Sequence, residues 1–328
     1  MLHLHFDENL PHQIYQKLWS YFIDHHVLGQ PMLIMLGALA VMFGEVLIRD
    51  WNKTALYRLF VRRSTSAKID LVFWALQTLG LAAFVEMAFT LGISFGGERL
   101  AQAAEQHANW ARIPLPSDGP IEIAFSFVVF WILSGFFGYW VHRLYHGAVF
   151  WKVHRFHHAA SELNFITALR LHPVESITRV LLPLSPLTLF HVPDGVLLVS
   201  VVAGNFINYC QHSEIDSDWG WMGRWIFGSP KVHQYHHSID DEHRDVNFGN
   251  CPLWDHVFGT WYGGGKEPSA YGTPDHAYDQ RPLWQFFQDA WACYRKMGAW
   301  LTWPIRKAAL RWTGAARSAG WAAEDRVD

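Results

Sequence analysis

The chain has 328 residues, of which 51% are hydrophobic, 16% aromatic and only 17% charged. A soluble domain usually carries about 25% charged residues, so this composition favours a membrane protein. The formal net charge of -3 argues against a nucleic-acid binder, because such a protein needs a basic surface to neutralise phosphates. Cys210, Cys251 and Cys293 form no Cys-x-x-Cys pair, so neither a disulfide framework nor a thiolate zinc site is indicated.

Two apolar segments in the first third of the chain are long enough to enter a bilayer. Residues 31–48 carry Glu45 as their only charge and can almost cross a hydrocarbon core about 30 Å thick. The next loop is rich in Lys and Arg, as cytoplasmic loops are, which places the N-terminus outside. Residues 69–95 are the second expected span, and Glu86 inside it requires a partner or a cavity. Residues 96–120 are expected to be a polar outer loop with a helix-forming stretch.

The third apolar segment, residues 121–141, carries a charge only at its start, at Glu122, and runs directly into His142. A further apolar region, residues 180–206, is broken by prolines, so either half alone is short for a span. We predict a hairpin that turns near residues 192–195. A single crossing would place the histidines of residues 142–158 and those of residues 233–237 on opposite sides of the membrane, where they could not share a site. The expected fold is all-α: an integral membrane helical bundle of about four membrane-embedded helical units, the last pair a hairpin that can be re-entrant, with a cytoplasmic histidine-rich helical cap.

Eight histidines near these segments occur in three short motifs. In a helix, residues three and four apart share a face, so each motif directs its imidazoles toward one point. Neutral imidazole is a common metal ligand. A zinc site would close at four ligands and no His-Glu-x-x-His is present, so eight convergent nitrogens predict two metal ions. The motifs are His142-Arg-Leu-Tyr-His146, His154-Arg-Phe-His157-His158 and His233-Gln-Tyr-His236-His237.

The C-terminal part has a different pattern. Trp284, Phe287, Trp291 and Tyr294 share one helical face, and basic residues lie close by. This pattern predicts an amphipathic segment at the inner leaflet. The expected domain boundaries are therefore 1–120 for two membrane helices and an outer loop, 121–265 for the catalytic part, and 266–328 for the interfacial segment and a tail.

The three motifs and their neighbours resemble the fatty acid hydroxylase and sterol desaturase superfamily of integral-membrane, non-haem di-iron enzymes. The resemblance covers roughly residues 125–262. Besides the three motifs it includes Leu171-His172-Pro-Val-Glu175, Gln211-His212-Ser-Glu214, Asn247-Phe-Gly249 and Trp254-Asp255-His-Val-Phe-Gly259-Thr260.

This resemblance implies two iron ions, O2 as co-substrate, and electrons from an external donor such as a ferredoxin or a cytochrome with its reductase. The implied activity is hydroxylation of an unactivated C–H bond of a lipid, whether fatty acyl, sterol or related. A desaturase on the same scaffold is one alternative, and a non-catalytic membrane metal-binding or transport protein is the alternative of another class. A bacterial inner membrane is favoured over the endoplasmic reticulum, with the histidines on the cytoplasmic face.

The resemblance also implies the site residues, with no catalytic residue beyond the metal centre. Asn208 stands where some members carry a further histidine, and Gly147 stands where several carry glutamate. Carboxylates are expected to offset the metal charge, although the acidic run 240–245 can equally be a solvated loop. The implied ligands are His142, His146, His154, His157, His158, His212, His233, His236 and His237. Residues that would bind metal or support a ligand are His172, Asn208, Glu175, Glu214 and Asp255, and Asp240 and Asp241 are further candidates to offset charge.

Overall fold

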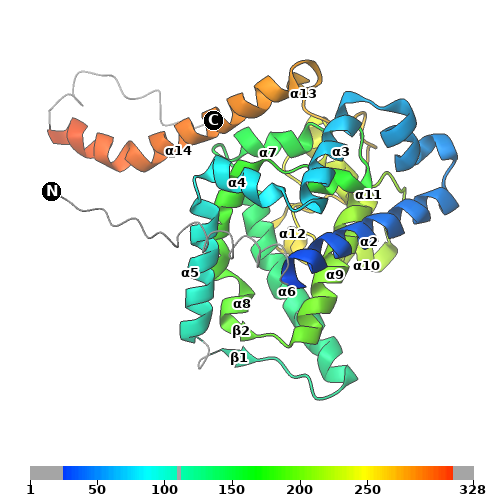
Figure 1. Ribbon diagram of the computed structural model, residues 1–328, viewed down its shortest axis with the longest axis horizontal. Coiled ribbons are helices and arrows are strands. Elements are labelled where there is room, and N and C mark those ends of the chain that lie inside the picture. Colours follow the sequence, from blue (N-terminus) through cyan, green and yellow to red (C-terminus); the bar gives the residue numbers. More distant parts are fainter. Residues whose placement is uncertain (1–24, 109–111, 313–328) are drawn as a thin grey trace, which may run out of the picture.

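The computed structural model describes residues 25–108 and 112–312, and the predicted C-terminal tail lies outside them. The described part is mostly helical, which confirms the all-α class. Two short strands, β1 (Ile113–Pro114) and β2 (Phe190–His191), pair in parallel. Figure 1 shows this pair at one end of the molecule, whereas the short helices α7 (Trp151–His158) and α11 (Pro230–His236) lie toward the other.

The central helix is α6 (Pro120–Tyr145), which contains the third predicted span. It begins with a proline at its first turn, where the missing N–H costs nothing, and His142 and Arg143 lie in its last turn. Its 26 residues rise about 39 Å, enough to cross a hydrocarbon core. Only 22% of its apolar window is buried inside the protein, so most of that window is free to face lipid. Among the described residues it is the one unbroken helix long and apolar enough to span a membrane.

The second predicted span is not a single straight helix. Residues 69–95 fall on α3 (Thr65–Thr78), α4 (Ala82–Thr90) and the start of α5 (Ile93–Ala108), and α3 and α4 are bent by 98°. Gly80 lies in the break with a φ of 70°, a conformation that glycine adopts without strain. The pair counts as a second span only as a broken or re-entrant one. The expected outer loop is also largely helical, because α5 occupies its first half.

The first predicted span falls on α2 (His25–Ile48), whose described apolar part, Leu36–Ile48, is shorter than a full span. Glu45 on this helix is buried and accepts a hydrogen bond of 2.7 Å from the backbone N–H of Ala55. Glu86 in α4 has the partner that its depth requires, since its Oε2 lies 2.7 Å from Arg179 Nη1. The bundle of four embedded units stays a prediction, to which α6 gives the clearest support.

The residues on either side of the predicted hairpin lie beside the same helix. The hairpin region, residues 180–206, falls on the end of η4 (Pro173–Leu184), on α8 (Pro186–Leu189) and β2, and on most of α9 (Asp194–Gln211). Before it, Glu175 accepts a hydrogen bond from His154 in α7, and after it His212 contacts His157 in α7. The chain therefore reverses direction at β2, close to the predicted turn.

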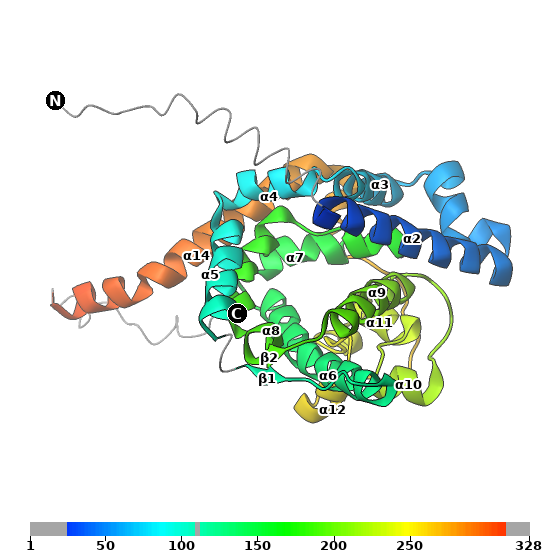
Figure 2. The ribbon, with the colours of Figure 1, turned by 60° about the horizontal axis from the view of Figure 1, so that its bottom comes forward.

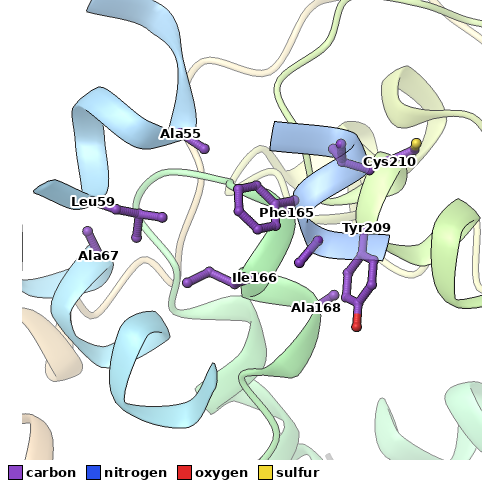
Figure 3. Packing of buried hydrophobic residues seen from close by; sticks show 10 residues of the cluster. Ala55, Leu59, Ala67, Phe165, Ile166, Ala168, Tyr209 and Cys210 are labelled. Atoms are coloured by element: carbon purple, nitrogen blue, oxygen red, sulfur yellow. The ribbon is translucent and has the colours of Figure 1, made fainter. Parts of the chain in front are cut away.

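Several helices share a core of buried hydrophobic side chains. Buried side chains of α2, α3, α9 and η3 (Phe165–Leu169) pack together, and Figure 3 shows Phe165, Ile166 and Tyr209 inside this cluster. Buried Asp70 on α3 also accepts hydrogen bonds from Asn164 (2.7 Å) and Thr167 (2.8 Å). The remaining helices are η1 (Trp51–Lys53), η2 (Tyr57–Arg62), α10 (Gly220–Trp225), η5 (Asp241–His243), α12 (Leu253–Phe258), α13 (Ala277–Gln280) and α14 (Pro282–Trp312).

Helix α14 carries the predicted C-terminal amphipathic segment. Figures 1 and 2 show that it reaches away from the body of the molecule. Its first part is anchored to α7 because Arg155 pairs with Asp289 at 2.6 Å. Trp284, Phe287 and Trp291 are exposed as expected, but the Tyr294 hydroxyl donates to the carbonyl of Phe89 and so lies on the packed side.

Candidate metal centre

Nine histidines converge at the C-terminal ends of four helices. The first motif ends α6, the second ends α7, the third ends α11, and His212 is the C-cap of α9. A helix C-terminus carries a partial negative charge of roughly half an elementary charge. Four such ends at one place therefore favour a bound cation.

The nine side chains form two groups, and within each group the potential ligand nitrogens lie within 4.8 Å of one another. Neighbours in the sequence separate, since His157 and His158 face different groups, as do His236 and His237. The structure thus brings together all eight motif histidines and His212. The five-histidine group is His142, His146, His154, His158 and His236, and the four-histidine group is His157, His212, His233 and His237.

The four-histidine group is a compact set of Nε2 atoms. His212 Nε2 lies 3.1 Å from His157 Nε2 and 3.0 Å from His233 Nε2. His237 Nε2 lies 3.1 Å from His233 Nε2. Nitrogens bound tetrahedrally at 2.0 to 2.1 Å from one ion are about 3.3 Å apart, so a small outward movement fits an ion here.

The five-histidine group is wider and holds unsatisfied nitrogens. His236 Nε2 lies 3.1 Å from His142 Nε2. Among the described residues, the buried Nε2 atoms of His146, His154 and His158 have no hydrogen-bond partner. Buried polar atoms normally have one, so these three fit metal ligands better than structural histidines.

Backbone carbonyls fix the tautomer of three ligands. The Nδ1 atom of His142 donates to the Phe248 carbonyl (2.7 Å), that of His236 to Val246 (2.7 Å), and that of His212 to Asn208 (2.8 Å). A carbonyl can only accept, so the proton is on Nδ1 and the lone pair is on Nε2. This is the usual outer support of a metal-binding histidine.

Carboxylates support two more ligands, both in the five-histidine group. Glu175 Oε2 lies 2.9 Å from His154 Nδ1, and Asp245 Oδ1 lies 3.2 Å from His146 Nδ1. Burial raises the pKa of Glu175 to about 8, while the backbone N–H of His172 lowers it. A cation on His154 would favour the carboxylate form of Glu175.

Burial also keeps the imidazoles neutral. It lowers the pKa of His212 to about 4, and it holds the pKa values of His154, His157 and His158 well below the ordinary value, helped by neighbouring histidines. The pKa values of His233, His236 and His237 are lowered for the same reasons. The lone pairs are therefore available to a metal near neutral pH.

A short loop after the third motif supplies two of the carbonyl acceptors, and Asp255 holds it. The Asp255 carboxylate accepts from the backbone N–H groups of Phe248 (2.8 Å) and Gly249 (2.9 Å). Burial raises the pKa of Asp255 to about 6. Asp255 thus acts on His142 and His236 through the loop rather than as a ligand.

The other candidates lie outside both groups. His172 caps η4: its Nδ1 accepts from the Val174 N–H (3.2 Å) and its Nε2 donates to the Phe286 carbonyl (3.1 Å), so both nitrogens are engaged.

Glu214 pairs with Arg58 and Arg49. Asp240 accepts from Ser269 and Asp241 pairs with Arg244, so neither contacts a motif histidine. Asn208 contributes its backbone carbonyl, while its side chain lines a cavity.

The sequence prediction missed Asp245, because the acidic run 240–245 offers several carboxylates and spacing cannot choose among them. Asp245 has a φ of 57°, a conformation that aspartate tolerates better than most residues. Its place directly before the Val-Asn-Phe-Gly loop is the one signal that separates it from the others.

Two cavities reach the five-histidine group at different histidines. A groove of 470 Å³ between α6 and α9 includes His142 and Asn208. A basin of 330 Å³ includes His146, His158 and Trp151, whose ring centroid lies 5.1 Å from that of His146.

Comparison with known proteins finds one family model and curated relatives that match part of this chain. Residues 127–260 match the family model described as Fatty acid hydroxylase. Ornithine lipid hydroxylase OlsE of Rhizobium tropici is 29% identical over 188 residues, which cover 57% of this chain and 56% of the relative. A putative methylsterol monooxygenase of Dictyostelium discoideum is 30% identical over 131 residues, which cover 39% of this chain and 48% of the relative.

The family model and the two relatives support the fatty acid hydroxylase and sterol desaturase superfamily for the part of the chain that they match, as the motifs indicated. It spans about half the length of the curated relatives it matches. No solved structure matches it.

Proposed function

We propose that the protein is a membrane-bound di-iron oxygenase that uses O2 and external electrons to hydroxylate an unactivated C–H bond of a lipid. The observation that carries the proposal is the pair of neutral, buried histidine groups at the end of α6. The family match supports it, as do relatives named as a lipid hydroxylase and a methylsterol monooxygenase.

The donor set fits two ions of intermediate softness. Imidazole suits iron, zinc, copper and nickel, and the family points to iron. The five- and four-histidine groups would each hold one ion, and Glu175, Asp245 and the four helix ends would offset the charge. Bound iron supplies the reduction of O2 and the removal of hydrogen from carbon. The chain holds the histidines in the correct tautomer and keeps bulk water away from the four-histidine group.

The substrate would approach through the groove between α6 and α9. Both helices expose apolar side chains, among them Phe136, Val201 and Phe206, so a lipid can reach the groove from the bilayer. His142 lies in the groove wall, which places the lipid beside the five-histidine group.

The electron donor would act at the basin. Trp151 lines the basin, and its ring centroid lies 5.1 Å from that of His146 and 5.3 Å from that of His158. We propose a ferredoxin, or a cytochrome with its reductase, as the donor. The proposed location is a bacterial inner membrane with the histidine groups on the cytoplasmic face.

Isotope labelling tests the activity. Cells that express the protein under heavy-isotope O2 should contain lipids that have gained one labelled oxygen, detected by mass spectrometry of lipid extracts. Cells with His157→Ala or His236→Ala should lack these products.

The same extracts separate the alternatives. Products lighter by two hydrogens and without label would instead indicate a desaturase, an outcome that the names of the relatives do not favour. Unchanged lipids in cells with iron-loaded protein would contradict the oxygenase and favour a metal-binding or transport role. The clustering of all nine histidines at one end of α6, rather than along a path through the helices, speaks against transport.

A further inference from the structure

We propose that the groove between α6 and α9 binds a lipid segment that carries a neutral hydrogen-bonding group, such as an amide or a hydroxyl, and that Asn205 and Asn208 recognise this group. The inference rests on the proposed function and deepens it by naming a substrate class. The groove would favour such lipids over lipids that present only hydrocarbon to the metal centre.

The groove has a polar wall although it opens between two apolar helices. Ser134, Asn205, Asn208 and Asn250 line it. In the part of the chain that the structure describes, no hydrogen bond engages the side-chain amide of Asn205 or Asn208. Both residues are partly exposed to the groove, and each amide offers two donors and an acceptor to a ligand there. The two amides therefore suit a ligand that supplies their partners.

The groove also lacks charge. Among the described residues, its wall contains no Asp, Glu, Lys or Arg side chain. An ammonium group would lose its hydration there without gaining an ionic partner, and a carboxylate or phosphate would be drawn to the proposed metal ions rather than to the asparagines. An amide or a hydroxyl can satisfy the asparagines without that penalty, so the polar group is predicted to be neutral.

Asn208 lies at the right place to set the position of a substrate. Its backbone carbonyl holds Nδ1 of His212, which belongs to the four-histidine group. Its side chain shares the groove wall with His142, which belongs to the five-histidine group. A ligand bound to Asn208 would therefore lie beside the five-histidine group, while the backbone of Asn208 is tied to the four-histidine group.

Two glycines leave room for the ligand. A Cβ atom on Gly138 would meet nothing within 4 Å, and one on Gly204 would meet only the Trp131 ring, at 3.8 Å. Both lie in helices, where glycine is less favourable than alanine by roughly 1 kcal/mol. The groove volume of 470 Å³ falls in the usual range of ligand sites, about 300 to 1,000 Å³.

A binding assay tests the proposal without relying on turnover. Full-length, iron-loaded protein in detergent is incubated with tritiated palmitamide, and unlabelled palmitamide or hexadecane competes. These probes have the same chain length and differ in the amide. Palmitamide should compete at least about tenfold better than hexadecane, as one or two buried hydrogen bonds predict.

The variants Asn205→Leu and Asn208→Leu keep similar volume and remove the amide. Each should weaken palmitamide binding by about tenfold and leave hexadecane unaffected. Asn208→Ser should recover part of the loss, and Asn52→Leu, the same change at an exposed position, should have no effect. Iron content and thermal midpoint of the same samples show whether each variant is folded.

Equal competition by the two probes, or normal palmitamide binding by folded Asn205→Leu and Asn208→Leu proteins, would overturn the proposal. The outcome is separable from that of the proposed function. Asparagine-dependent binding without labelled lipid products would leave the site standing and remove the oxygenase. Labelled products whose yield is unchanged in both leucine variants would remove the site and leave the oxygenase.

Discussion

The five-histidine group and the four-histidine group differ in their surroundings. The five-histidine group borders both the groove and the basin, and two of its members contact carboxylates. Neither the groove nor the basin includes a member of the four-histidine group, and its histidines are all buried. The closed group resembles a site that only holds its ion, whereas the five-histidine group has access for substrate and electrons. The predictions below test this difference.

The largest effect is expected from removal of a ligand. His157→Ala leaves three histidines in the four-histidine group, whereas His158→Ala leaves four in the other. Both variants should lower the yield of labelled lipid products at least about a hundredfold. Loss of a group that only hydrogen-bonds to a metal ligand already lowers metal affinity or activity by roughly ten- to a hundredfold. Iron per chain should fall further in His157→Ala than in His158→Ala.

The control for this pair is His191→Ala, an exposed histidine of β2, which should retain normal iron and products. Equal iron content in the two ligand variants would contradict the distinction between a closed and an open group.

The supporting carboxylates should differ in the same assay. Glu175 is buried and Asp245 is 61% exposed. Glu175→Gln should weaken iron binding by roughly 10- to 100-fold, and Asp245→Asn by less, because solvent replaces its contact with His146 more easily. Iron titration monitored by competition with a chelator measures both. A larger effect of Asp245→Asn would mean that burial does not set the strength of this support.

Filling the groove should impair products without removing iron. Gly138→Leu places a side chain in open space within the groove, so we expect about a tenfold loss of labelled lipid with normal iron content. Gly298→Leu in α14 is the matched control, because a Cβ there also meets nothing within 4 Å. Normal product yield in Gly138→Leu would show that the substrate does not use the groove.

Acid should destabilise the metal-free protein through the buried histidines. His212 has a pKa of about 4 when folded and an ordinary value of 6.5 when unfolded, so the unfolded chain binds the proton first. Its contribution is present above pH 6.5 and is lost as pH falls toward 4, an effect of about 3 kcal/mol. The thermal midpoint should drop over this range, and the drop should be smaller in His212→Gln. An equal drop in both proteins would contradict the role of His212.

The motif histidines were predictable because helical spacing fixes a shared face. The division into two groups was not, because it depends on how α6, α7, α9 and α11 meet. We predicted the hairpin because the third histidine motif had to lie near the first two. In the structure Glu175 and His212, on either side of the hairpin, both contact α7. The 98° bend between α3 and α4 was not predicted, because mostly apolar residues continue through it and Gly80 is a weak signal by itself. His172 matched a family motif, but only the structure shows both of its nitrogens engaged.

Metal analysis of the purified full-length protein tests the central claim most directly. Protein purified without oxygen and loaded with ferrous iron should hold two ions per chain by mass spectrometry of the elements. His157→Ala should lose one of them, and the exposed-site control His191→Ala should keep both. One ion or none in the native protein, or a full complement of iron in His157→Ala, would contradict a centre built from two histidine groups.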